Sequence, residues 1–193
     1  MADRGLGYDV TMWLLKPLGI ERARTRLVAG LSGRVLEVGV GTGLTLRHYR
    51  PGSGPVAGID VDRTALERAQ RRRRGGTALL AADVHDLPFR EGFFDAVVVS
   101  LVFCSVRDPG RGLAELRRVL KPGGELRMIE HVRSGRPAVA RWQDRVAPGW
   151  LRCTGDCHFD RRTQDAVRAA GFVIEQESGH VGGIGVEIRA TRG

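Results

Sequence analysis

Short apolar runs rich in β-branched residues alternate along the chain with segments whose apolar residues recur at helical spacing. The runs predict strands at residues 34–38, 55–60, 77–84, 94–101 and 125–132. The run at 94–101 is the most apolar, which predicts that its strand lies at the centre of the sheet. Strands and helices that alternate in this way form a parallel sheet covered by helices on both faces, so the pattern predicts an α/β fold.

The segments between the strands predict helices. One follows the glycines of 39–43 and runs through residue 49, a second covers 62–74, and a third begins at Pro109 and ends at 121–124. A last helix at 162–170 ends at Gly171, and strands at 172–176 and 185–189 pair to close the sheet. The prediction is therefore a Rossmann-like, mostly parallel sheet of seven strands.

Two segments depart from this alternation. Residues 8–29 predict a helix with Trp13, Leu14, Leu18 and Leu27 on its apolar side. Residues 134–160 contain Trp142, Trp150, two prolines and three glycines without a clean period, which predicts a helix plus an irregular covering segment that resembles a lid. We expect a single domain over 1–193, with an N-terminal helical segment at 1–32 and the covering segment at 134–160.

Composition places the chain among ordinary globular proteins. It has 193 residues, of which 42% are hydrophobic and 27% charged, and its apolar runs are too short to span a bilayer. No secretory leader is evident, so we expect a cytoplasmic protein. The net charge of +9 comes from arginines spread along the whole chain, and the run at 71–74 falls at a helix end that favours cations. We therefore do not expect a nucleic-acid partner.

Three cysteines, Cys104, Cys153 and Cys157, form no paired C-x-x-C motif, which indicates reduced thiols. Cys153, Cys157 and His158 would be half of a zinc site, but the sequence spacing lacks a second pair of ligands. We therefore expect no metal.

The strongest chemical signal follows the first strand. Glu37 precedes three glycines spaced G-x-G-x-G, at positions 39, 41 and 43. A dinucleotide site would use G-x-G-x-x-G around a pyrophosphate, and an acid at the strand end repels a phosphate but attracts an ammonium group. The loop therefore predicts a ligand without a pyrophosphate, which argues against a dehydrogenase.

Two further acids follow the next two strands. Asp60 can accept two hydrogen bonds from vicinal ribose hydroxyls, and Asp83 can accept the exocyclic amine of adenine beside the apolar Val84. A glycine loop, a ribose acid and an adenine acid in this order predict a nucleoside cofactor.

These motifs resemble those of the class I S-adenosylmethionine-dependent methyltransferases, of the small-molecule type related to the ubiquinone and menaquinone methyltransferases. The resemblance covers about residues 33–176 and includes Phe-Asp-Ala-Val-Val at 94–98 and Leu-Arg-Arg-Val-Leu-Lys-Pro-Gly-Gly at 116–124. It implies S-adenosylmethionine as cofactor and S-adenosylhomocysteine as product. The implied cofactor-binding residues are Glu37, Gly39, Gly41, Thr42 and Gly43 for the methionine part, Asp60 and Val61 for the ribose, Asp83 and Val84 for the adenine, and Ser100 and Leu101 beneath the methyl group.

A narrower set of motifs resembles the membrane-associated alkyl thiol methyltransferases of animal endoplasmic reticulum and their bacterial relatives. The matching segments are 101–106, 130–132 and 142–143, together with Cys157 and Arg161. That family has a long apolar N-terminal anchor, which we do not find, and a glycine where this chain has Asp156. The implied acceptor-pocket residues are Phe103, Cys104, Trp142, Gln143, Cys157 and Arg161.

Methyl transfer from a sulfonium needs mainly positioning and exclusion of water, so a general base is optional. His131 at the end of the fifth strand is the first candidate base, and His158 on the covering segment is the second. Alternatively, His131 only bonds the covering segment. Arg161 either pairs with Asp156 or Asp160 or orients that segment.

Other residues also leave two interpretations open. Cys104 either packs as a small buried hydrophobe, our first interpretation, or lines the acceptor pocket. Phe103, Trp142 and Trp150 either complete the core or cover an apolar acceptor.

The leading functional hypothesis is methylation of a small, partly apolar acceptor, with a thiol first and a phenol or amine next. One alternative acceptor is a phospholipid headgroup, with the N-terminal segment making peripheral contact with a membrane. An RNA methyltransferase is favoured only by the charge. A non-catalytic binding subunit is disfavoured because Glu37, Asp60 and the loop glycines are all present. We expect a monomer or a homodimer.

Overall fold

The computed structural model describes residues 19–73, 76–154 and 156–193. These residues contain one seven-stranded sheet in the order β3-β2-β1-β4-β5-β7-β6. Its strands are β1 (Val35–Val38), β2 (Val56–Asp60), β3 (Thr77–Ala81), β4 (Phe94–Ser100), β5 (Leu120–His131), β6 (Phe172–His180) and β7 (Gly185–Arg192). Strands β1 to β5 run parallel to one another, and β7 runs antiparallel to both β5 and β6. The predicted α/β fold with seven strands is confirmed.

Alternation along β4 divides the core between the two faces of the sheet. Val97 and Val99 face one apolar cluster, which also holds residues of α4 (Pro109–Val119) and α6 (Thr163–Ala169). Ala96 and Val98 face the other cluster, which holds residues of α2 (Ile20–Val28) and α3 (Arg63–Arg72). This two-sided burial explains why the run at 94–101 is almost wholly apolar, and it confirms β4 as a central strand.

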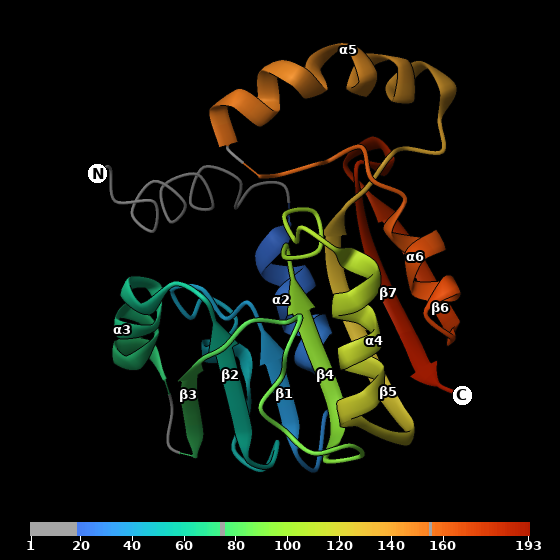
Figure 1. Cartoon of the computed structure of the whole chain (residues 1–193). Helices are drawn as coiled ribbons and strands as arrows, with labels where there is room; N and C mark the ends of the chain where they lie inside the picture. The colour runs from blue at the N-terminus through green and yellow to red at the C-terminus, as the bar shows by residue number, and fades with distance from the viewer. Residues whose placement is uncertain (1–18, 74–75, 155) are drawn as a thin grey trace.

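The parallel strands all end at one edge of the sheet, which we call the carboxyl edge. Figure 1 shows α5 (Pro137–Thr154) lying above this edge, away from the two faces of the sheet. The chain order reverses between β1 and β4, since β2 and β3 lie on one side of β1 and β5 on the far side of β4. Open α/β sheets bind ligands at the carboxyl edge beside such a switch point.

Three helix ends are capped, and those at Asp108 and Gly171 match the sequence prediction. Asp62 accepts hydrogen bonds from the backbone N–H groups of Thr64 and Ala65, and Asp108 accepts one from Arg111 before Pro109 opens α4. Gly171 has a φ of +85° after α6, as a C-terminal glycine cap requires. Arg71 and Arg72 of the arginine run lie in the last turn of α3, as predicted, and Arg73 is its C-cap.

Some boundaries were predicted wrongly. The helix expected after the glycine loop is a single 3-10 turn, η2 (Leu46–His48), because Pro51 disfavours helical backbone at Arg50 and leaves too short a segment. Strand β5 begins at Leu120, so residues 121–124 lie inside it at a register shift opposite β4 instead of ending the helix. Strand β3 ends at Ala81, and β6 and β7 are longer than expected.

The covering segment is more helical than its sequence indicates, since α5 continues through Pro148 to Thr154. Of the helix expected at 8–29, α2 is the described part, and Leu27 is buried as predicted. Trp13, Leu14 and Leu18 lie outside the described residues. Within the described chain, every helix is too short or too polar to cross a bilayer.

Candidate functional site

The glycine loop connects β1 to the neighbouring elements at the carboxyl edge. Gly39 has a φ of +66°, and a Cβ atom there would lie 2.3 Å from Cγ2 of Val102. Only glycine therefore lets the loop after β4 approach the end of β1 so closely. Gly41 has a φ of +52° and no heavy atom within 4 Å of the same built position, so its surroundings are open. The loop combines one tightly packed glycine with one that a ligand can approach.

Asp60 lies next to this loop at the end of β2. Its Oδ2 atom accepts a hydrogen bond of 2.8 Å from the Gly41 backbone N–H, and its Oδ1 atom accepts one of 2.9 Å from the N–H of Asp62. Each carboxylate oxygen keeps a second lone pair, so the group can still accept two hydroxyl donors. Val61 beside it is 69% exposed. Asp60 thus fixes the loop and offers free acceptor capacity at the same time.

Glu37 is buried beneath the loop. Desolvation raises the pKa of Glu37 to about 8, although Tyr49, Arg24 and Thr45 all act to lower it. Its Oε2 atom and the Oγ atom of Ser100, at the end of β4, are buried and have no hydrogen-bond partner within the described chain. Two orphaned acceptors at one edge match a ligand that brings N–H or O–H donors.

Asp83 follows β3 on an exposed turn. Its carboxylate accepts a hydrogen bond from the backbone of His85 and lies 2.6 Å from Nδ1 of the same ring. These bonds lower the pKa of Asp83, while the Nε2 atom of His85 accepts a bond of 3.2 Å from the N–H of Asp108. Val84 is buried beside them. We did not predict a role for His85, although its place two residues after Asp83 could have indicated one.

The cofactor residues therefore meet at one edge, as the resemblance implies. Thr42 is buried and tied to α3, since its carbonyl and hydroxyl oxygens both accept from Arg72 at 2.9 and 2.8 Å. Glu37 and Ser100 have oxygen atoms without a donor, which suits an amine of the ligand. The open surroundings of Gly41 suit a backbone contact, and the free lone pairs of Asp60 suit the hydroxyls of a ribose. The residues present thus fit S-adenosylmethionine.

A buried glutamate organises the other part of the edge. Glu130 near the end of β5 is fully buried and accepts hydrogen bonds of 2.9, 2.8 and 3.1 Å from the backbone N–H groups of Val102, Phe103 and Cys104. The same turn begins at Leu101, whose φ of +60° is unusual for a residue with a side chain. Glu130 therefore holds the loop after β4 in a strained shape. Sequence reasoning missed this role.

Three side chains of types that can bind a metal ion lie close together near Glu130. The Sγ atom of Cys157 lies 3.5 Å from Nδ1 of His131, and these atoms and Sγ of Cys104 all lie within 4.8 Å of one another. Bonding to Cys104 and His131 lowers the pKa of Cys157, whereas Cys157 and burial raise the pKa of Cys104. Burial opposes the shift at His131, but Cys157 and Glu130 outweigh it and raise that pKa.

Three of the expected acceptor-pocket residues fix loops instead. Arg161 donates to the carbonyl oxygens of Phe103 and Val106 at 2.8 and 2.6 Å, so it orients the covering segment and does not pair with the acids beside it. Gln143 is buried and bonds Ser134, Val132 and Phe159 through their backbones. Phe103 is fully buried in the core. All three side chains were expected to line the acceptor pocket, and none of them lines the cavity at this edge.

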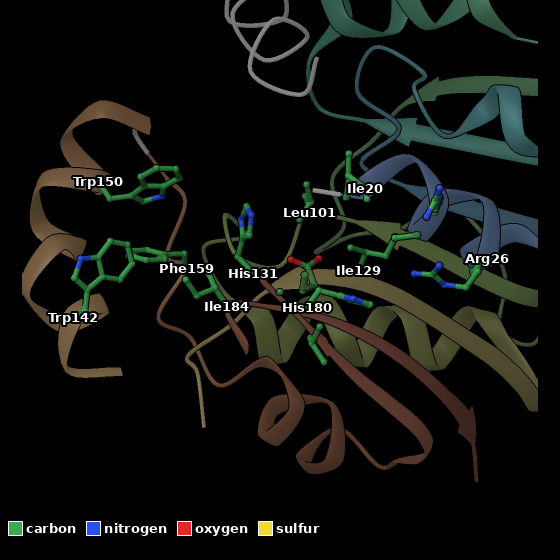
Figure 2. Close-up of a pocket in the computed structure, with 16 residues that line it drawn as sticks. Ile20, Arg26, Leu101, Ile129, His131, Trp142, Trp150, Phe159, His180 and Ile184 are labelled. Atoms are coloured by element: carbon green, nitrogen blue, oxygen red, sulfur yellow. The ribbon is translucent and has the colours of Figure 1, made fainter. Parts of the chain in front are cut away.

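A cavity of about 470 Å³ opens beside these groups; we call it the acceptor cavity. Its lining is mostly apolar and comes from α2, the ends of β4 and β5, α5 and the turn before β7, including Ile20, Leu101, His131, Trp142, Trp150 and Phe159. In the view of Figure 2, His131 lies between Leu101 and Phe159. Trp142 and Trp150 are 51% and 41% exposed and pack against Phe159, so they form a rim.

The two candidate bases differ in their surroundings. His131 lines the cavity and contacts Cys157. His158 is joined to the site through its backbone, which donates a hydrogen bond of 2.7 Å to the carbonyl of Cys104. A catalytic role of either ring stays a prediction. Cys104 is buried, as our first interpretation held, but its thiol belongs to the cluster with His131 and Cys157.

A family model described as a methyltransferase domain matches residues 36–128. The chain is 38% identical to a demethylmenaquinone methyltransferase of Clavibacter sepedonicus and 34% identical to the thiol S-methyltransferase TMT1B of Homo sapiens. Each of these alignments covers 75% of this chain and 63% of the relative. The chain thus spans a little less than two thirds of the length of these relatives.

Among solved structures, a SAM-dependent methyltransferase from Thermotoga maritima superposes with a TM-score of 0.73 at 24% identity, over 98% of this chain and 97% of that one. A geranyl diphosphate methyltransferase in complex with SAM has a TM-score of 0.73 at 17% identity, over 90% of this chain and 85% of that one. At these identities the likeness shows the fold, which is that of the class I methyltransferases.

Proposed function

Because the chain belongs to the class I S-adenosylmethionine-dependent methyltransferases, we propose that it transfers a methyl group to a small, partly apolar acceptor, with an alkyl thiol as the first choice. The observation that carries this proposal is the position of the acceptor cavity. Leu101 lines the cavity, and the next residue, Val102, packs on Gly39 of the cofactor loop. The two binding regions therefore meet at the turn after β4.

The chain's own residues would act mainly by positioning. S-adenosylmethionine supplies an electrophilic methyl group on a sulfonium. Glu37 and Ser100 would accept donors of its methionine part, Asp60 would hold the ribose and Asp83 the adenine amine. The apolar cavity wall would exclude water from the reacting atoms, and the acceptor's reacting atom would lie beside His131.

Two features of the cavity favour a thiol. Its lining surface is mostly apolar, which suits an uncharged alkyl chain, and the polar side chain of His131 lies in contact with the thiol of Cys157 at one end. The relatives named as thiol S-methyltransferases align over about three quarters of this chain. The aromatic rim of Trp142 and Trp150 supports a ring acceptor such as a phenol or quinone as the second candidate.

The experiment offers isotope-labelled S-adenosylmethionine to the purified protein with separate pools of alkyl thiols, phenols and quinones, amines, and phospholipid vesicles. Products are identified by mass. A labelled methyl thioether supports the thiol proposal, and a labelled ring product supports the second candidate. Product from the amine or lipid pool alone contradicts both. The Asp60→Ala variant is the matched control, because it should lower product formation from every pool.

A further inference from the structure

We propose that Cys104, His131 and Cys157 form a zinc site whose fourth position binds the acceptor thiolate. This inference rests on the proposed function for the acceptor, but not for the metal. The sequence predicted no metal, because Cys153, Cys157 and His158 lack a partner pair. The fold assembles a different set, with ligand atoms from the loop after β4, the end of β5 and the segment before α6.

The distances match the requirements of the ion. Zinc bonds of about 2.3 Å to sulfur and 2.0 to 2.1 Å to nitrogen, at tetrahedral angles, place a sulfur and a nitrogen ligand about 3.5 Å apart and two sulfurs about 3.8 Å apart. Cys157 Sγ and His131 Nδ1 lie 3.5 Å apart, and all three ligand atoms lie within 4.8 Å of one another. The site can therefore close with shifts of about 1 Å or less.

Hydrogen bonds outside the cluster hold the three ligands in place. The N–H of Cys104 donates to Glu130, and its carbonyl accepts from His158, the residue after Cys157. Arg161 fastens the same covering segment to the carbonyls of Phe103 and Val106. His131 is paired with Gly185 in the sheet. The ligand positions are thus fixed by the fold before any ion binds, as a preorganised site requires.

Charge and ligand type point to the same ion. Two thiolates and one neutral imidazole balance the charge of Zn²⁺, which lets the sulfurs stay ionised in a half-buried, mostly apolar place. Thiolate and imidazole ligands together favour zinc over the hard cations magnesium and calcium. A set of three protein ligands leaves one tetrahedral position open, as catalytic zinc sites do.

The open position would serve the acceptor, because His131 also lines the acceptor cavity. An alkyl thiol entering there would displace a water ligand, release its proton to solvent and bind as a thiolate. Its sulfur lone pair would form the new bond to the methyl carbon, while the electron pair of the broken carbon–sulfonium bond stays on the leaving sulfur as a neutral thioether. No oxidant, reductant or separate protein base is needed.

The first test measures metal content independently of activity. Tag-free protein is purified with zinc in the medium, dialysed and analysed by elemental mass spectrometry. We expect about one zinc per chain in the parent protein, as a single three-ligand site requires. Cys157→Ser and His131→Gln should lose roughly 100-fold or more in zinc affinity, since even changes beyond the ligands cost 10- to 100-fold. His48→Gln, on η2, is the matched control that should keep the metal.

Cobalt provides the second readout. Co²⁺ added to the zinc-free protein should give the visible absorption of a tetrahedral cobalt–thiolate site, and an alkyl thiol should shift that absorption where an alcohol of equal chain length does not. Because Cys104 is buried, Cys104→Ser can lose metal by losing its fold, so its circular dichroism is measured as well. The variants of His131 and Cys157, which are half-buried, decide whether the site exists.

The outcomes separate the two proposals. Zinc bound by the parent protein and lost in both ligand variants supports the site, whatever the product panel shows. Equal zinc content in parent and Cys157→Ser overturns the site, and full thiol methylation by zinc-free protein overturns the role of its fourth position in binding the acceptor; both leave the methyltransferase proposal standing. Zinc bound at the triad without any thioether product overturns the thiol proposal instead.

Discussion

The carboxyl edge of the sheet has two parts that are held together in different ways. On the side of β1, β2 and β3, which we call the cofactor side, the carboxylates of Asp60 and Asp83 bond residues close in sequence, with separations of 19 for Gly41 and Asp60 and of 2 for Asp83 and His85. On the side of β4 and β5, the acceptor side, the contacts of Glu130, Cys157 and Arg161 join residues 26 to 58 positions apart.

This difference has a physical consequence. The cofactor side needs only strands that end at the same edge, each followed by its own acid. The acceptor side needs three distant loops to meet, and buried backbone groups are bonded only when they do. We therefore expect substitution of Glu130, which joins the acceptor-side loops, to cost mainly folding stability, and substitution of Asp60 on the cofactor side to cost mainly ligand binding.

The largest effect should come from Glu130→Ala. It leaves three buried backbone N–H groups, those of Val102, Phe103 and Cys104, without an acceptor. Each unsatisfied donor costs about one to three kcal/mol, and the variant no longer has to bury a carboxylate, which offsets part of this cost. The free energy of unfolding should therefore fall by roughly 5 kcal/mol. Urea denaturation followed by circular dichroism measures this loss.

Glu130→Gln is the matched control, because the amide keeps an acceptor oxygen of the same shape. It should lose less than half as much stability as the alanine variant. Equal losses for the two variants, or a loss below 1 kcal/mol for alanine, would break the comparison, since the acceptor-side loops would then hold without their glutamate.

The second effect tests the cofactor side through pH. The pKa of Glu37 is raised from 4.5 to about 8 in the folded chain, so the native state binds the proton more tightly than the unfolded state. Stability from this group is fully present below pH 4.5 and is lost as pH rises through 8. At 1.36 kcal/mol per pKa unit, the free energy of unfolding should drop by roughly 4 kcal/mol across that window.

Glu37→Gln should remove most of this slope, because the amide does not titrate. Chemical denaturation at half-unit steps between pH 4.5 and 8.5 compares the two proteins without cofactor. Parallel curves for parent and variant would mean that Glu37 is ionised in the folded protein, and that the cofactor side holds a buried charge.

Sequence reasoning could place the expected cofactor residues at one edge because each of them belongs to a strand end. Glu37 lies in β1 just before its glycines, Asp60 ends β2 and Asp83 follows β3, so the order along the chain already lists the expected site. Parallel strands then place their ends together without further information. Even the caps at Asp62 and Asp108 could be read from neighbouring residues.

The acceptor side could not be read in this way. Nothing near Glu130 in the sequence indicates that its carboxylate accepts hydrogen bonds from three backbone N–H groups 26 to 28 residues away. The cysteine spacing pointed to Cys153 and His158, whereas the ligand atoms that converge belong to Cys104, His131 and Cys157. Phe103 and Gln143 matched a family motif, but burial shows that both are structural. Long-range packing decided each of these cases.

The third effect is on cofactor binding. Asp60→Ala removes the acceptor of the ribose hydroxyls and should weaken S-adenosylmethionine binding by about 1.5 to 3 kcal/mol, the range for hydrogen bonds to a charged group. Asp62→Ala is the control, since that side chain caps α3 and should cost helix stability without a comparable loss of affinity. Calorimetric titration measures both variants, and equal affinities for Asp60→Ala and the parent would contradict the assignment.

The smallest effect should come from the rim of the acceptor cavity. Trp142 is 51% exposed and meets Phe159 edge-on, with ring centroids 6.1 Å apart. Trp142→Ala removes a cavity-lining ring that would pack against the acceptor, and since an aromatic contact is worth about 0.5 to 1.5 kcal/mol, KM for the acceptor should rise by about 2- to 10-fold. Affinity for S-adenosylmethionine should not change, because the rim belongs to the acceptor side. Val173→Ala, an exposed apolar position on β6, is the control. Steady-state kinetics with the alkyl thiol at saturating cofactor measures the change. A shift in cofactor affinity larger than that in KM would mean that the two sides act as one unit, despite the different range of their contacts.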